Sequence, residues 1–241
     1  MLRSKPDGYH FRIWVPGCSS GEEVYSVAIL IQECFRSLGR NFTVQIFGTD
    51  LDEDAIHIAR AGVYPDSIKL DVSAERLEKF FTRDDEGFKI KKNIREMVVF
   101  AEQNVVKDPP FTKLDMLCCR NLLIYFGPEL QAQLLPVFHY SLKPGGILLL
   151  GSSENIGRST KQFSLLDKKW KIFARRTDKR GTGQSLQLPE RTFFHRLPEE
   201  PMIAETRGIK DAGTVSLLQA ILHESKVPVC VVVDDKAELI Y

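Results

Sequence analysis

The sequence lacks an excess of charge of either sign and lacks any long apolar run. Its 33 Lys and Arg residues nearly balance 32 Asp and Glu residues, so no overall field draws the chain onto nucleic acid or an anionic membrane. No apolar run approaches the roughly 20 residues of a membrane helix, and the N-terminus does not resemble a signal peptide. We therefore expect a cytoplasmic protein with no nucleic-acid partner and no direct insertion into a membrane.

Cysteine pairs are also lacking. The five cysteines, which are Cys18, Cys34, Cys118, Cys119 and Cys230, show neither a CxxC spacing nor a neighbourhood rich in histidine. This pattern argues against a zinc site and against a disulfide framework, and we predict no metal. In contrast, hydrophobic residues make up 43% of the chain, which is ample for a buried core.

Strand and helix patterns alternate along most of the chain. Short apolar runs typical of strands alternate with segments in which apolar residues recur at helical spacing. Such alternation predicts an α/β fold in which helices cover a parallel sheet and ligands bind at the carboxyl ends of the strands. The expected strands are 11–15, 44–47, 114–118 and 147–150, the expected helices are 24–38, 52–61 and 128–142, and 170–174 is expected as an antiparallel edge strand.

Two parts of the chain depart from this alternation. Residues 64–100 combine an amphipathic stretch with a hairpin around 82–87 and strands at 87–91 and 97–100, so they predict a small antiparallel β-subdomain inserted in a domain spanning 1–176. Residues 177–213 have the composition of a linker. A helix-like segment and an apolar strand then follow in 214–241, where we expect a second domain to begin.

A turn between the first strand and first helix carries Gly17 and Gly21. Glycines allow backbone to approach a ligand closely, and a helix N-terminus presents free N–H groups. The turn is also compatible with a purely structural role. Asp50 ends the second strand, where a carboxylate can accept hydrogen bonds from both hydroxyls of a ribose. An NAD-dependent enzyme is a less favoured alternative, because the turn lacks the G-x-G-x-x-G spacing that a pyrophosphate needs.

Five motifs together resemble the CheR methyltransferase family. They are WVPGCSSGEEVYS at 14–26, FGTDLD at 47–52, CRNLLIYF at 119–126, KPGG at 143–146 and GSSE at 151–154. The resemblance covers about residues 11–176. It implies a Rossmann-like class I methyltransferase fold and S-adenosylmethionine as cofactor, with S-adenosylhomocysteine as product. It also implies that the protein is a protein-glutamate O-methyltransferase acting on the cytoplasmic helices of chemoreceptors.

The resemblance also assigns roles to cofactor-binding residues. Glu23 would contact the methionyl part of the cofactor and Asp50 its ribose. Asn104 and Val105 match the segment on the adenine side, and Asn121 and Leu122 match the loop that lines the methionyl region. From the residues alone, two alternatives stay open. Glu23 could simply be a first-turn carboxylate that interacts favourably with the positive end of the helix, and Asn104 could be a turn residue. Asn121 has independent support because it follows an apolar strand at the expected ligand edge.

Methyl transfer to a carboxylate needs alignment more than acid-base help, because a glutamate side chain is already ionised at neutral pH. Arg120 and Tyr125 are the candidates to orient the incoming carboxylate. The alternatives are an ion pair for Arg120 and a packed aromatic ring for Tyr125.

Members of the family carry a helical N-terminal domain, and this chain is expected to begin after it. The segment 214–241 resembles the start of a PAS sensor domain. Both observations leave a second function open, in which the chain is a non-catalytic cofactor-binding, scaffold or sensory module of a signalling fusion protein.

Overall fold

The computed structural model describes residues 5–85, 87–157 and 159–177. Apart from Thr177, the expected linker and the expected PAS-like segment lie outside the described residues. No helix within the described ranges is long and apolar enough to cross a membrane.

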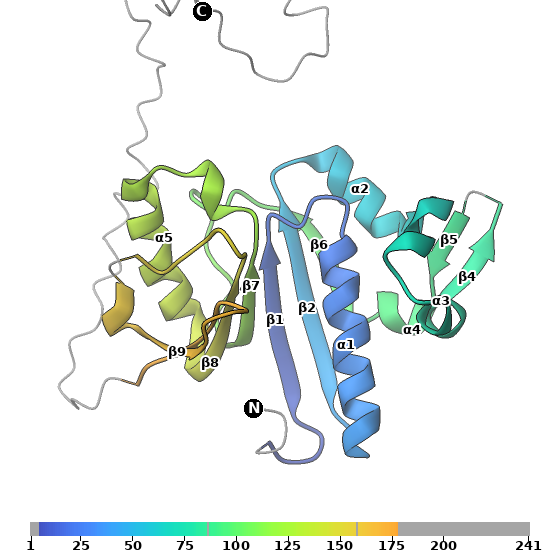
Figure 1. Cartoon of the computed structure of the whole chain (residues 1–241), viewed down its shortest axis with the longest axis horizontal. Helices are drawn as coiled ribbons and strands as arrows, with labels where there is room; N and C mark the ends of the chain where they lie inside the picture. The colour runs from blue at the N-terminus through green and yellow to red at the C-terminus, as the bar shows by residue number, and fades with distance from the viewer. Residues whose placement is uncertain (1–4, 86, 158, 178–241) are drawn as a thin grey trace, which may run out of the picture. The chain divides into compact units, whose positions relative to one another are not determined.

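A seven-stranded sheet forms the centre of the described domain (Figure 1). Its order is β6-β2-β1-β7-β8-β10-β9, and β10 runs antiparallel to both its neighbours while the other strands share one direction. The strands are β6 (Val98–Glu102), β2 (Thr43–Asp50), β1 (His10–Pro16), β7 (Leu114–Cys119), β8 (Leu142–Leu150), β10 (Ile172–Arg175) and β9 (Phe163–Asp167). The predicted Rossmann-like α/β fold is confirmed. Its strand order reverses between β1 and β7, where such sheets open a crevice for ligands.

Three longer helices follow strands of this sheet, and their ends have local causes. Helix α1 (Glu22–Leu38) ends at Gly39, whose φ of 59° suits glycine. Helix α2 (Glu53–Ala61) begins after Asp52, whose side chain accepts hydrogen bonds from two backbone N–H groups of the first turn. Helix α5 (Pro128–Ser141) begins with proline at its first position.

The sheet separates two apolar cores. Ile13 and Val15 of β1 belong to the core that contains α1, whereas Trp14 belongs to the core that contains α5. This follows from the strand geometry, in which successive side chains point to opposite faces. The predicted strands and helices around residues 11–61 and 114–150 are therefore confirmed, with both faces of the sheet buried.

A small subdomain follows α2 and extends the first core. Its sheet has the order β3-β5-β4 and is antiparallel, and the hairpin predicted around 82–87 is confirmed. The elements are β3 (Val63–Tyr64), the 3-10 helix η2 (Asp66–Leu70), α3 (Ala74–Phe80), β4 (Phe81–Asp84), β5 (Gly87–Ile90) and α4 (Lys92–Arg95).

The structure corrects three of the predictions about individual strands and turns. The strand expected at 97–100 does not belong to the subdomain but pairs as β6 with β2 of the central sheet. Gly48 makes this possible, since a Cβ there would lie 2.7 Å from the ring of Phe100. The turn expected at 143–146 is part of β8. Strand β10 is not the edge of the sheet, because β9 pairs with its outer side.

Candidate active site

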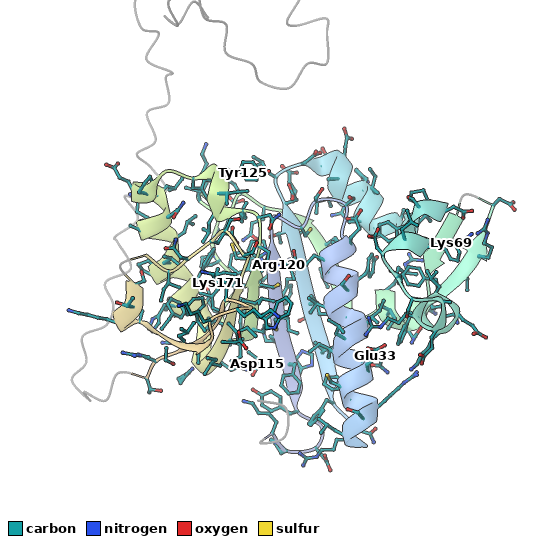
Figure 2. All side chains as sticks on the ribbon, viewed as in Figure 1. Glu33, Lys69, Asp115, Arg120, Tyr125 and Lys171 are labelled. Atoms are coloured by element: carbon teal, nitrogen blue, oxygen red, sulfur yellow. The ribbon has the colours of Figure 1, made fainter. Side chains whose placement is uncertain are left out.

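The loops after β1, β2, β6, β7 and β8 all leave the sheet at its carboxyl edge, because these strands share one direction. Figure 2 shows Arg120 and Tyr125 at this edge, while Asp115 lies toward the opposite end of the strands. These loops, together with the last residue of β2 and the first turn of α1, contain every residue that the sequence predicted for the site. Their contacts show which of these residues the fold brings together.

The glycine turn after β1 packs directly on the loop after β7. Gly17 has a φ of 66°, and a Cβ at this position would lie 2.9 Å from Cδ1 of Leu122. Gly21 has a φ of 89°, and a Cβ there would lie 2.8 Å from Cβ of Ala59. Both positions therefore require glycine for conformation and for space. The close approach joins two predicted cofactor segments that lie about a hundred residues apart.

Asp50 at the end of β2 holds the same turn. Its Oδ2 accepts a hydrogen bond from the backbone N–H of Ser19 at 2.7 Å, and its Oδ1 accepts one from that of Asp52 at 3.1 Å. Its backbone carbonyl accepts from the N–H of Gln103 at 2.8 Å. The side chain is half-buried, and two oxygens offer about four acceptor sites in all. Asp50 thus organises three loops and keeps acceptor capacity.

Glu23, in the first turn of α1, faces the end of β7. The thiol of Cys118 donates to Glu23 Oε1 at 2.8 Å, and Nη1 of Arg120 lies 3.7 Å from the same oxygen. Burial, followed by the negative charge of Glu23, raises the pKa of the Cys118 thiol well above its usual value, so the thiol remains the donor. Oε2 accepts no hydrogen bond from the described residues. Glu23 is therefore more than a residue that favours a helix end.

Asn104 and Val105 lie in a turn after β6. The Asn104 side-chain oxygen accepts hydrogen bonds from the N–H groups of Val106 and Lys107, at 3.0 and 3.1 Å. The turn alternative for this side chain is therefore confirmed. Val105 packs against the same apolar core as Leu122, so both predicted segments are anchored on one core.

The loop after β7 has a strained start and a buried anchor. Asn121 has a φ of 55°, a left-handed conformation that asparagine tolerates better than most residues. The next residues form the 3-10 helix η3 (Leu123–Tyr125). The N–H groups of Leu122 and Leu123 donate to Glu154 Oε1 at 3.0 and 2.8 Å. Glu154 belongs to a motif that the sequence shows, yet the sequence gives no sign that its carboxylate reaches this loop.

The two candidate catalytic side chains are accessible. The Arg120 side chain is 48% exposed and forms an ion pair with Glu23, which is the alternative that the sequence left open for this residue. Tyr125 is 78% exposed, so the alternative of a packed aromatic ring is wrong. Neither side chain is buried by the described part of the chain, which leaves both available to a second molecule.

This arrangement defines a class of site. A glycine turn, one carboxylate able to accept from a diol and another able to accept from an ammonium group lie at the carboxyl edge of a doubly wound sheet, and these groups suit a nucleoside that carries an amino acid. The described residues contain no group of three His, Cys, Asp or Glu side chains that could hold a metal ion.

The chain belongs to the family described as CheR methyltransferase, SAM binding domain, which matches residues 2–172. The predicted family and the predicted cofactor, S-adenosylmethionine, are thereby confirmed.

Individual relatives agree with the family. The chain is 38% identical over 208 residues to an uncharacterised 104.1 kDa protein of Rhodobacter capsulatus, covering 83% of this chain and 22% of that protein. It is 39% identical over 160 residues to a chemotaxis protein methyltransferase of Vibrio parahaemolyticus, covering 64% of this chain and 58% of the relative. The chain thus spans less than two thirds of either relative.

One solved structure illustrates how remote the structural likenesses are. The S-adenosylmethionine-dependent methyltransferase from Thiobacillus denitrificans, in complex with S-adenosyl-L-homocysteine, is 19% identical with a TM-score of 0.36. The match covers 60% of this chain and 42% of that one. At this TM-score the likeness adds nothing to the assignment.

Proposed function

We propose that the protein transfers a methyl group from S-adenosylmethionine to glutamate side chains of chemotaxis receptors in the cytoplasm. The observation that carries this proposal is the pair of carboxylates, Asp50 and Glu23, that flank the glycine turn and keep free acceptor capacity. The relative from Vibrio parahaemolyticus, named a chemotaxis protein methyltransferase, supports the choice of substrate.

The residues at the carboxyl edge fit the chemistry of this cofactor. Asp50 would accept hydrogen bonds from the ribose hydroxyls, and Glu23 Oε2 would accept one from the methionyl ammonium group. Asn104 and Val105 would line the adenine side. Since the Asn104 side-chain oxygen is used within its own turn, its contribution would come from the amide NH2 group or from the backbone.

The described residues also suit the substrate. When bound, the cofactor supplies an electrophilic methyl group: a glutamate carboxylate oxygen bonds the methyl carbon as the carbon–sulfur bond breaks. The bonding electrons stay on the sulfur, so the products are a glutamate methyl ester and S-adenosylhomocysteine. The substrate carboxylate needs no base, because it is ionised at neutral pH. Arg120 has five donors and, within the described part of the chain, one partner at 3.7 Å, so it can receive a carboxylate. Asn121 and Leu122 would line the methionyl region, and Tyr125 would lie beside the substrate.

Methyl transfer is the direct test. The full-length protein that contains this chain would be incubated with labelled S-adenosylmethionine and the cytoplasmic helices of its cognate receptor. We expect base-labile label on receptor glutamates, and no label from a variant with Asp50→Ala. Label that resists base, or none from the unaltered protein, would contradict the proposal.

A second candidate function is a non-catalytic module that binds the cofactor within a signalling protein. The observation that favours it is the relative of 104.1 kDa, which this chain matches over only 22% of its length and which therefore contains much besides this domain. The module would bind S-adenosylhomocysteine and a receptor or kinase without forming ester. Receptor binding by the unaltered protein without any methyl transfer, together with receptor binding that survives Asp50→Ala, would support it.

A further inference from the structure

Glu154 is buried, yet it contacts no cation among the described residues. Only 4% of the residue is exposed. Its Oε2 accepts a hydrogen bond from the N–H of Gly151 at 2.6 Å, and its Oε1 accepts from those of Leu122 and Leu123. Three backbone N–H groups thus compensate a buried carboxylate. Hydrogen bonds to a charged acceptor are stronger than those between neutral groups.

The carboxylate joins two loops that the sheet alone would leave separate. One loop follows β8 and contains Gly151, and the other follows β7 and contains Asn121 and Leu122. Space at the junction is limited, because a Cβ on Gly151 would lie 2.7 Å from Glu154 Oε2 and 3.0 Å from Asn121 Oδ1. The carboxylate and the asparagine therefore share a volume that only glycine leaves open.

A second side chain, that of Gln131, binds backbone carbonyl groups of the same loop. Nε2 of Gln131, on α5, donates to the carbonyls of Leu123 and Phe126 at 2.9 and 2.8 Å. Glu154 accepts from N–H groups at the start of the loop, and Gln131 donates to carbonyls farther along it. The loop that carries the predicted methionyl contacts is thus fixed at both ends by side chains rather than by strand pairing.

We infer that Glu154 is a positioning residue for the cofactor site, acting through the backbone of Leu122 and Leu123 to set the conformation of Asn121. The inference rests on the proposed function, since it assumes that Asn121 and Leu122 line the cofactor. It gives Glu154 no contact with the cofactor or the substrate. Its effect is to hold the left-handed start of the loop against the glycine turn, where Leu122 meets Gly17.

The test compares Glu154→Gln with Glu154→Asp, and uses Glu129→Gln, an exposed change in the first turn of α5, as the matched control. The Gln variant keeps the shape but turns an NH2 group toward backbone donors. The Asp variant keeps the charge but is shorter. Two measurements are made on the 241-residue chain: calorimetric affinity for S-adenosylhomocysteine, and hydrogen exchange of the backbone amides.

We expect Glu154→Gln to weaken S-adenosylhomocysteine binding by about tenfold, with Glu154→Asp between it and the unaltered chain. Exchange should accelerate at Leu122 and Leu123 in both variants while β1 and β2 stay protected, which a general loss of stability would not produce. The control should change neither measurement.

Exchange at Leu122 and Leu123 that is unchanged in both variants would overturn the inference. So would accelerated exchange spread evenly over the sheet, because the role would then be structural only. If the unaltered chain does not bind S-adenosylhomocysteine, the proposed function fails, and the exchange measurement then decides separately whether Glu154 holds the loop at Leu122 and Leu123. If Glu154→Gln does not fold, the Asp variant provides the same comparison.

Discussion

The central sheet carries one carboxylate near each end of its strands, and the two differ in burial and in hydrogen bonding. At the amino end, Asp115 of β7 is 2% exposed and accepts hydrogen bonds from the Tyr9 hydroxyl at 2.7 Å, the Arg12 N–H at 3.0 Å and Lys143 Nζ at 2.8 Å. At the carboxyl end, the Asp50 carboxylate is half-buried and, among the described residues, accepts from just two backbone N–H groups. A saturated, paired carboxylate serves stability, whereas we propose that one with free acceptor sites at the carboxyl edge serves binding.

Asp115→Ala should produce the largest effect on stability. Removing the carboxylate of this network leaves Lys143 without a counter-charge and the Tyr9 O–H without its acceptor, so we expect a loss of about 3 kcal/mol in the free energy of unfolding. Urea denaturation measures this loss. Affinity for S-adenosylhomocysteine, corrected for the folded fraction, should stay the same. A large fall in affinity would show that Asp115 does not act on stability alone.

Asp50→Ala should have a large effect on cofactor affinity and a small effect on stability. Losing two hydrogen bonds to a charged acceptor is expected to weaken binding of S-adenosylhomocysteine by about a hundredfold. The free energy of unfolding should fall by only about 1 kcal/mol, through the lost contact with the Ser19 N–H. Calorimetric titration and urea denaturation give the two values. Asp54→Ala, an exposed change on the neighbouring helix, is the control and should leave affinity intact.

A smaller effect concerns Tyr25, whose hydroxyl donates to the Ala59 carbonyl at 2.8 Å inside the first core. Burial raises the pKa of Tyr25 to about 12 from its usual 10. Because the folded pKa is the higher one, this stabilisation is complete below pH 10 and is lost as the pH rises toward 12.

In Tyr25→Phe, the loss of unfolding free energy between pH 8 and pH 11 should be smaller than in the unaltered chain by about 1 kcal/mol. Denaturation at the two pH values tests this. Equal losses in both proteins would show that Tyr25 does not contribute to the alkaline decline.

Much of the fold follows from local patterns in the sequence. The alternation of strands and helices, the glycine turn and the place of Asp50 at a strand end were all predictable, because they depend on periodicity and on turn chemistry. The pairing of residues 98–102 with β2 was not, since a short apolar strand does not reveal its neighbour. It depends on Gly48 leaving room for the ring of Phe100, which is a tertiary fact.

The candidate site likewise has parts that the sequence could predict and parts that it could not. Motifs identified Gly17, Glu23 and Asn121, yet no spacing could show that Cys118 donates to Glu23 or that Glu154 holds the loop at Leu122. These contacts cross about thirty to a hundred residues of chain and depend on how the strands are ordered. The roles of Arg120 and Tyr125 toward a substrate stay predictions, because both act on a second molecule.

We propose that the carboxyl edge binds a nucleoside carrying an amino acid, and not a dinucleotide. Calorimetric titration of the 241-residue chain with S-adenosylhomocysteine and, in parallel, with NAD tests it most directly. We expect micromolar binding of S-adenosylhomocysteine that Asp50→Ala weakens by about a hundredfold, and no heat from NAD. Binding of NAD, or S-adenosylhomocysteine binding of equal strength in Asp50→Ala, would contradict it.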